Sequence, residues 1–144
     1  SFRDLKSLTD RMTAVMIKAD GVGIAAPQIG VSLRIFILAP AAIGGDDPVV
    51  FINPRNMRIS GVKIEDREGC LSLPGLWHHV VRKSVVTLGA FDPHGTPFSI
   101  EANGNIFSLL PRALQHEMDH LNGKLFIDRL RVGERRRALR EWRK

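Results

Sequence analysis

Two histidines and a glutamate form the pattern H-E-x-x-H at residues 116–120 of this chain. Side chains four positions apart lie on one face of a helix, so His116 and His120 can bind one metal ion from adjacent turns. Glu117 lies beside them, where a carboxylate can hold a metal-bound water. The alternative is an exposed helix with scattered polar residues. Leucines at positions 110, 114 and 121 disfavour it, because they mark a buried side on which unsatisfied polar groups are costly.

The chain has one cysteine, Cys70. A lone cysteine is more often a small core residue than a ligand, but the neighbouring Glu68, Gly69 and Ser72 are poor core formers. A thiolate and two imidazoles would leave one coordination position open, which is the arrangement of a catalytic metal. A single cysteine forms no internal disulfide, so a reducing compartment is favoured.

A third segment, residues 21–28, is rich in small residues and ends in Gln28. It lacks the lysine and hydroxyl residue of a phosphate-binding P-loop, and it does not follow a strand as a dinucleotide-binding motif does. Small residues permit a ligand to approach the backbone closely, with the Gln28 amide as a donor. A helix end followed by a plain turn would explain the glycines but not the whole run.

Length and composition indicate a single globular domain over residues 1–144. The chain is 44% hydrophobic and 25% charged, and no apolar run approaches the roughly 20 residues that span a bilayer. The net charge of +6 is concentrated in residues 131–144, which hold seven Lys or Arg and two Glu. This basic C-terminal segment, expected to be helical from about Gly133, suits a polyphosphate surface such as RNA and serves equally well as a solubilising helix.

The apolar pattern predicts an α+β fold, with antiparallel β-sheets around a central helix that carries the H-E-x-x-H residues. Apolar residues at helical spacing in residues 5–16 predict an N-terminal helix. The chain begins at this helix, which suggests that an N-terminal segment is missing. Strands are expected at residues 33–39, 49–52, 53–66, 80–91 and 98–102.

Three turn or cap signals delimit these elements. Pro74 and Gly75 are expected to end any strand that holds Cys70. Ser108 is the expected N-cap of the central helix, and Gly123 is expected to end it.

Together the three polar segments resemble the motifs of the peptide deformylase family, G-x-G-x-A-A-x-Q, E-G-C-x-S and Q-H-E-x-D-H. These motifs occupy residues 21–28, 68–72 and 115–120, and the similarity extends through residues 122–128. The resemblance implies removal of the formyl group from the N-terminal formyl-methionine of new polypeptides, with release of formate. It also implies one divalent metal ion, with iron(II) favoured and zinc, nickel or cobalt possible in purified protein.

The resemblance implies a role for each motif residue. Cys70, His116 and His120 would bind the metal, and Glu117 would transfer the water proton to the departing amine. The Gln28 side chain and the Leu71 backbone N–H would donate to the oxygen that becomes negative during attack.

Further residues would bind substrate or support the ligands. Gly23 would let the substrate backbone approach, and Val22, Leu109 and Ala113 would line an apolar slot for methionine, although they could equally be core residues. A supporting ion pair is expected between Glu68 and Arg82, with Asp119 as a further member. Such partners orient the metal ligands.

The implied partners are N-formyl-methionyl nascent peptides and, through the basic C-terminal helix, the ribosome. Neither a membrane nor a specific nucleic-acid sequence is expected as a partner. The implied location is the bacterial cytoplasm, or a mitochondrion or plastid in a eukaryote. One alternative is a zinc endopeptidase, which would take its third ligand after the helix, where only Asp128 and Glu134 are available. The other is a non-catalytic ribosome- or RNA-binding module with a structural metal.

Overall fold

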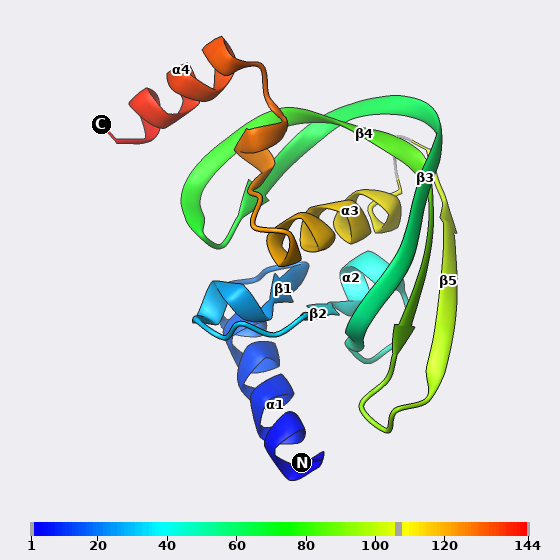
Figure 1. Cartoon of the computed structure of the whole chain (residues 1–144). Helices are drawn as coiled ribbons and strands as arrows, with labels where there is room; N and C mark the ends of the chain where they lie inside the picture. Colours follow the sequence, from blue (N-terminus) through cyan, green and yellow to red (C-terminus); the bar gives the residue numbers. More distant parts are fainter. Residues whose placement is uncertain (1, 106–107, 144) are drawn as a thin grey trace.

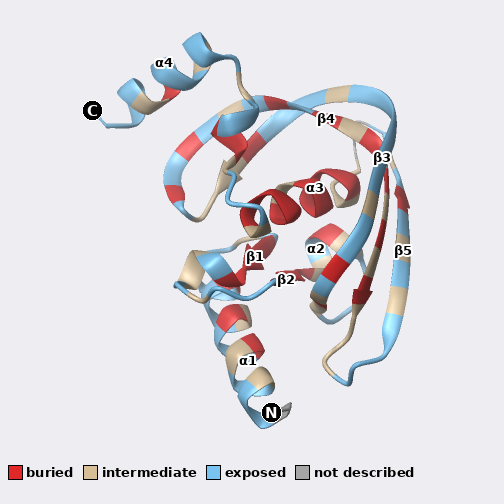
Figure 2. Cartoon of the chain, in the orientation of Figure 1, coloured by how far each residue is buried: buried red, intermediate tan, exposed pale blue. Residues whose placement is uncertain are grey.

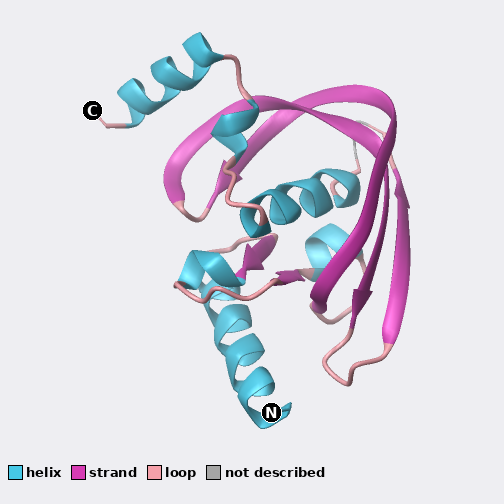
Figure 3. Cartoon of the chain, viewed as in Figure 1, coloured by secondary structure: helices cyan, strands magenta, loops and turns pink. Residues whose placement is uncertain are grey.

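The computed structural model describes residues 2–105 and 108–143, in which five strands form one antiparallel sheet in the order β1-β2-β3-β4-β5 (Figures 1 and 3). The two long central strands form a hairpin that curves over a helix, α3 (Leu110–Leu121), so that α3 lies inside the bend (Figure 1). This arrangement confirms the predicted α+β fold with a central helix. The strands are β1 (Gly23–Ala25), β2 (Ile35–Leu38), β3 (Val49–Cys70), β4 (Leu73–Phe91) and β5 (Pro97–Asn103).

Helices also lie at both ends of the described chain, as predicted. The N-terminal helix is α1 (Phe2–Lys18), and the basic C-terminal helix is α4 (Val132–Trp142). None of the helices in the described ranges is long and apolar enough to cross a membrane. Three elements of four residues were not predicted, because they are too short to show a hydrophobic period: α2 (Pro40–Ile43) and the 3-10 helices η1 (Ala26–Ile29) and η2 (Phe126–Arg129).

The core packs α3 against the concave side of the sheet. Phe36 and Phe51 stack there with ring centroids 4.5 Å apart, in the same cluster as Leu114 of α3. Figure 2 shows α3 buried along most of its length. Met12 and Met16 of α1 pack in a second cluster with residues of β1 and β2. Because α3 is so enclosed, each of its polar side chains needs a partner inside the protein.

The expected strand end at Pro74 and Gly75 was wrong. The chain reverses between Cys70 and Leu73, which are paired, and β4 then runs through both residues. Pro74 is tolerated because the pairing is irregular at this end, with a register shift between Gly69 and Cys70. The expected break at the start of residues 53–66 was also wrong, since β3 is one strand of 22 residues with local irregularities.

The helix cap at Ser108 was a further wrong prediction. The N-cap of α3 is Leu109, with no side-chain cap, while the Ser108 hydroxyl accepts a hydrogen bond from the Asn105 backbone N–H at 3.2 Å. The predicted end of the helix is confirmed, because Gly123 follows the C-cap residue and has φ 76°. This left-handed conformation favours glycine.

Candidate metal centre

Three donor atoms from α3 and the end of β3 converge at one point. The Cys70 Sγ lies 3.2 Å from the His120 Nε2, which lies 3.1 Å from the His116 Nε2. All three atoms are within 4.8 Å of one another. One thiolate and two imidazoles are a donor set that suits zinc, iron(II), nickel and cobalt. The predicted ligands are therefore brought together, and their chemistry fits a divalent metal ion.

The surroundings favour the ligand form of Cys70. Burial raises the pKa of its thiol, but hydrogen bonds from His116 and His120 outweigh burial and lower the pKa to about 5. The Ser72 backbone N–H also donates to the sulfur, at 3.4 Å. The thiolate, which is the form that binds metals, is therefore favoured at neutral pH.

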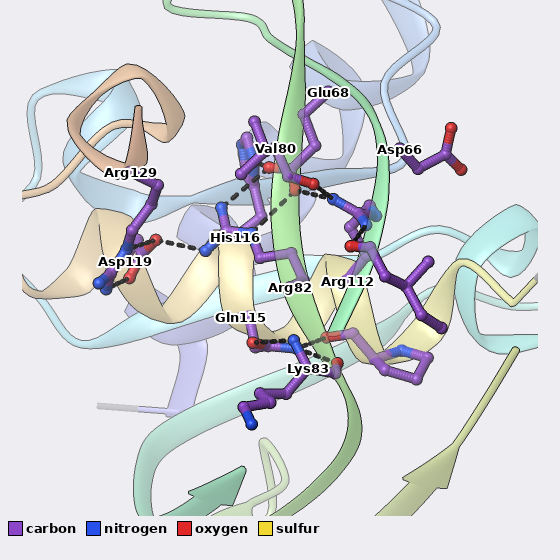
Figure 4. Close-up of polar contacts among 12 residues, drawn as sticks. Asp66, Glu68, Val80, Arg82, Lys83, Arg112, Gln115, His116, Asp119 and Arg129 are labelled. Carbon is purple, nitrogen blue, oxygen red and sulfur yellow. Dashed lines mark hydrogen bonds and ion pairs between the residues drawn. The ribbon is translucent and has the colours of Figure 1, made fainter. Parts of the chain in front are cut away.

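His116 is oriented by Glu68, a residue of β3 whose carboxylate contacts the His116 ring (Figure 4). The His116 Nδ1 is 2.8 Å from a Glu68 carboxylate oxygen, so the Nε2 is directed toward Cys70. Burial lowers the pKa of His116, but hydrogen bonds to Cys70 and Glu68 raise it to about 10. Binding of a metal there would release a proton, because the ligand form of histidine is neutral.

Two arginines hold the Glu68 carboxylate. Arg82 donates from Nε at 2.8 Å and from Nη2 at 2.9 Å, and Arg112 donates from Nη1 at 2.7 Å (Figure 4). Burial raises the pKa of Glu68, but the hydrogen bonds from Arg82 and His116 outweigh burial and lower it. The predicted contact of Glu68 with Arg82 is present, and Asp119 joins it through a 2.7 Å contact with Arg82.

Sequence reasoning missed Arg112 and Arg129. Arg112 also donates to the carbonyls of Val80 and Ile64, each at 2.8 Å, so it ties α3 to both long strands. Arg129 of η2 donates to the Asp119 carboxylate from Nε at 3.0 Å. A signal for Arg112 did exist, since it lies one turn before His116 and therefore on the same helix face.

Glu117 is almost fully buried and incompletely paired. Its Oε2 has no hydrogen-bond partner among the residues that the structure describes. Burial raises the pKa of Glu117 to about 7 and outweighs the charges of His116 and His120, which lower it. A Cβ on Gly23 would lie 2.7 Å from the Glu117 Oε1, so this carboxylate occupies the space that a side chain on Gly23 would need. A carboxyl group with a pKa near neutrality suits a general acid and base.

A cavity of about 470 Å³ adjoins the metal-site donors Cys70 and His116, a size typical of small-ligand sites. Its lining includes every residue predicted to contact substrate, namely Val22, Gly23, Gln28, Leu71, Leu109 and Ala113. The Gln28 side-chain oxygen, Oε1, accepts a hydrogen bond from the Ala25 backbone N–H at 2.8 Å. This bond directs the Gln28 NH₂ group toward Cys70, with its nitrogen 3.4 Å from the sulfur.

Comparison with known proteins gives many close matches. The polypeptide deformylase family model matches residues 1–136. The peptide deformylase of Clostridium botulinum is 48% identical over 125 residues, which cover 87% of this chain and 79% of that protein. The peptide deformylase of Chlorobium phaeobacteroides is 40% identical over 142 residues, covering 96% of this chain and 73% of that protein. The chloroplastic peptide deformylase 1B of rice is 41% identical, covering 88% of this chain and 46% of that protein.

Solved structures agree with the sequence relatives. A peptide deformylase from Legionella pneumophila superposes with a TM-score of 0.86 at 43% identity, covering 99% of this chain and 81% of that one. A peptide deformylase from Synechococcus elongatus, solved with actinonin, also gives 0.86, at 38% identity, covering 96% of this chain and 74% of that one. The matches do not support an endopeptidase or a non-catalytic binding module. By family model, by sequence identity and by fold, this chain belongs to the polypeptide deformylase family.

Proposed function

We propose that Cys70, His116 and His120 hold the metal ion with which this deformylase removes the formyl group from N-terminal formyl-methionine. The supporting observation is that the three donors converge beside an incompletely paired, buried Glu117 and an open cavity. A metal ion bound there would act as a Lewis acid and lower the pKa of water. The donor set suits several metals, and we propose iron(II) as the physiological one, with zinc, nickel or cobalt able to replace it.

Glu117 is the proposed proton carrier. In the first step a water oxygen attacks the formyl carbon, and Glu117 accepts the proton that the water loses. In the second step the carbon–nitrogen bond breaks, and Glu117 delivers this proton to the departing amine. The products are formate and a polypeptide with a free N-terminal amine. A pKa of about 7 permits both transfers at neutral pH.

Two donors are proposed for the formyl oxygen, which becomes negative as water attacks. They are the Gln28 side-chain NH₂ and the Leu71 backbone N–H. Support for Gln28 comes from its fixed orientation, since its carbonyl end is held by Ala25 and its NH₂ end lies near Cys70. Donors fixed before the reaction stabilise the transition state without reorganisation, and removing one typically costs about 10²–10³ in kcat.

Methionine recognition is assigned to the apolar part of the cavity. Val22, Leu109 and Ala113 line the same cavity as Cys70 and His116. A thioether side chain is apolar and flexible, so a slot of this kind accepts it without a polar partner. Gly23, in the same lining, is proposed to let the substrate backbone come close.

The basic helix α4 is proposed to bind ribosomal RNA, near the point where formylated chains emerge. Its arginines at positions 136, 137 and 140 are exposed, while Ala138 on the opposite side is buried against the body. The positive side is therefore free to meet phosphates. Action beside bacterial or organellar ribosomes would place the protein in a bacterial cytoplasm, a mitochondrion or a plastid.

The direct test is formate release from formyl-Met-Ala-Ser, measured without oxygen and with added iron(II). The wild-type chain is expected to release formate. Glu117→Ala is expected to keep its metal, measured by elemental analysis, and to lose turnover by at least about 10²-fold. Wild-type turnover in the variant would contradict the assignment of Glu117, and absence of formate from both proteins would contradict the function.

A further inference from the structure

The cavity has an aromatic side chain at its rim that the proposed mechanism does not use. Trp77 on β4 lines the cavity, and the residue is 58% exposed. Cys70 and His116 line the same cavity, so an open path connects the reaction centre with this ring. A substrate that continues beyond its first residue can therefore reach Trp77.

The position of the Trp77 ring is fixed by two residues of β3. Trp77 is paired with Gly69, and a Cβ on Gly69 would lie only 2.8–2.9 Å from three atoms of the ring. The ring thus lies over Gly69, in space that any other residue would fill. The Arg67 guanidinium carbon is 5.6 Å from a Trp77 ring centroid, within the range of a cation–π contact.

These contacts leave an aromatic surface that is held in place and still open to solvent. Aromatic rings attract one another in stacked or edge-to-face arrangements, beyond the effect of buried area alone. Because the ring is already ordered, little side-chain conformational entropy is lost when a ligand packs on it. A second aromatic side chain is the natural occupant of such a surface.

We propose that Trp77 is a specificity-determining residue that contacts the third residue of the substrate and favours an aromatic side chain there. The inference rests on the proposed function. In an extended peptide, successive side chains point to opposite sides. If methionine enters the cavity, the second side chain points away from it, and the third returns to the cavity side, where Trp77 lies.

The test compares kcat/KM for formyl-Met-Ala-Phe and formyl-Met-Ala-Ala on the iron-loaded protein. A ratio is used because it cancels any general loss of activity in a variant. The wild-type ratio is expected to be about two- to tenfold in favour of phenylalanine, the range for one aromatic pair. Trp77→Ala is expected to bring the ratio close to one, and Trp77→Phe to keep most of it. The preference should lie in KM rather than kcat, since the contact is remote from the formyl group.

Trp142→Ala is the matched control. The Trp142 indole N–H donates to the Pro74 carbonyl at 2.7 Å, so this variant disturbs the same hairpin end but removes no cavity-lining side chain. The ratio is expected to persist in it. Equal loss in both tryptophan variants would overturn the proposal, because movement of the hairpin would then explain the effect.

Two further outcomes separate this inference from the function itself. Formate release with a wild-type ratio of one, or a preference that appears instead with formyl-Met-Phe-Ala, would overturn the role of Trp77 and leave deformylation intact. Absence of formate from every peptide would overturn the proposed function, and the specificity proposal with it.

Discussion

Replacing Gly23 by alanine gives a sharp test of how the buried carboxylate is positioned. The new Cβ would lie 2.7 Å from the Glu117 Oε1, 3.0 Å from its Cδ and 3.0 Å from the Leu38 Cδ2. Leu38 cannot easily move, because it is fully buried in the core, and the backbone of Glu117 is held in the enclosed helix α3. The carboxylate is therefore expected to move or rotate.

Two magnitudes follow for Gly23→Ala. Overpacking of a filled interior typically costs about 1–3 kcal/mol of folding free energy. Loss of a correctly placed general base typically costs about 10²–10⁴ in rate. We therefore expect a modest decrease in stability together with at least about a 10²-fold decrease in kcat. Metal content is expected to be unchanged, because the added methyl group meets none of the three proposed ligands among its nearest neighbours.

The assay is formate release at saturating peptide, with thermal unfolding and elemental analysis on the same samples. Gly133→Ala is the control, since a Cβ there has no neighbour within 4 Å and the residue lies in α4. It should be as active as the wild type and at least as stable, because alanine favours a helix more than glycine does. Wild-type kcat in Gly23→Ala, or loss of its metal, would refute the reasoning that Gly23 acts by leaving room for the Glu117 carboxylate.

The remaining predictions concern the support of the metal site, the metal and α4. Glu68→Gln leaves Arg82 and Arg112 buried beside a neutral amide, so we expect a loss of about 3–5 kcal/mol in denaturant unfolding. It should also weaken zinc binding about 10–100-fold in competition titrations, and unchanged affinity would contradict the orienting role of Glu68. Chelation of the metal should lower Tm and abolish turnover. Zinc added at a free concentration of about 100 Kd should raise the free energy of unfolding of the metal-free protein by about 2.7 kcal/mol. An unchanged Tm after chelation would contradict a bound metal. Replacing the arginines at positions 136, 137 and 140 by glutamine should weaken ribosome binding, most visibly at low salt, and leave turnover of a short peptide unchanged. Ribosome affinity equal to that of the wild type would show that these three side chains do not contact the ribosome.

Local spacing was sufficient to predict the metal-site residues that lie on α3. His116 and His120 lie four positions apart, and the helix rule alone places them on one face. Cys70 was different, because nothing local shows that the end of a strand returns to that helix. Its assignment came from comparing three segments at once. The supporting pair of Glu68 and Arg82 likewise depended on the family resemblance.

Contacts between distant segments explain most of what the sequence did not show. Arg112 donates hydrogen bonds to Glu68 and to two backbone carbonyls on different strands, and no pattern in its own helix specifies those acceptors. Pro74 is an ordinary strand breaker by local rules, yet the irregular pairing next to Cys70 accommodates it. Ser108 illustrates competition, because its hydroxyl accepts from a preceding loop N–H instead of capping the helix.

The enclosure of α3 within the curved sheet has a consequence for biosynthesis. All five strands precede α3 in the chain, so during synthesis the concave face of the sheet emerges before the segment that covers it. At roughly 5–20 residues per second, completing α3 after the last strand takes on the order of seconds. Apolar side chains such as Phe36 and Phe51 lack their helical cover during that interval. Slower translation between β5 and α3 should therefore lengthen the exposure of this surface to aggregation and to chaperones.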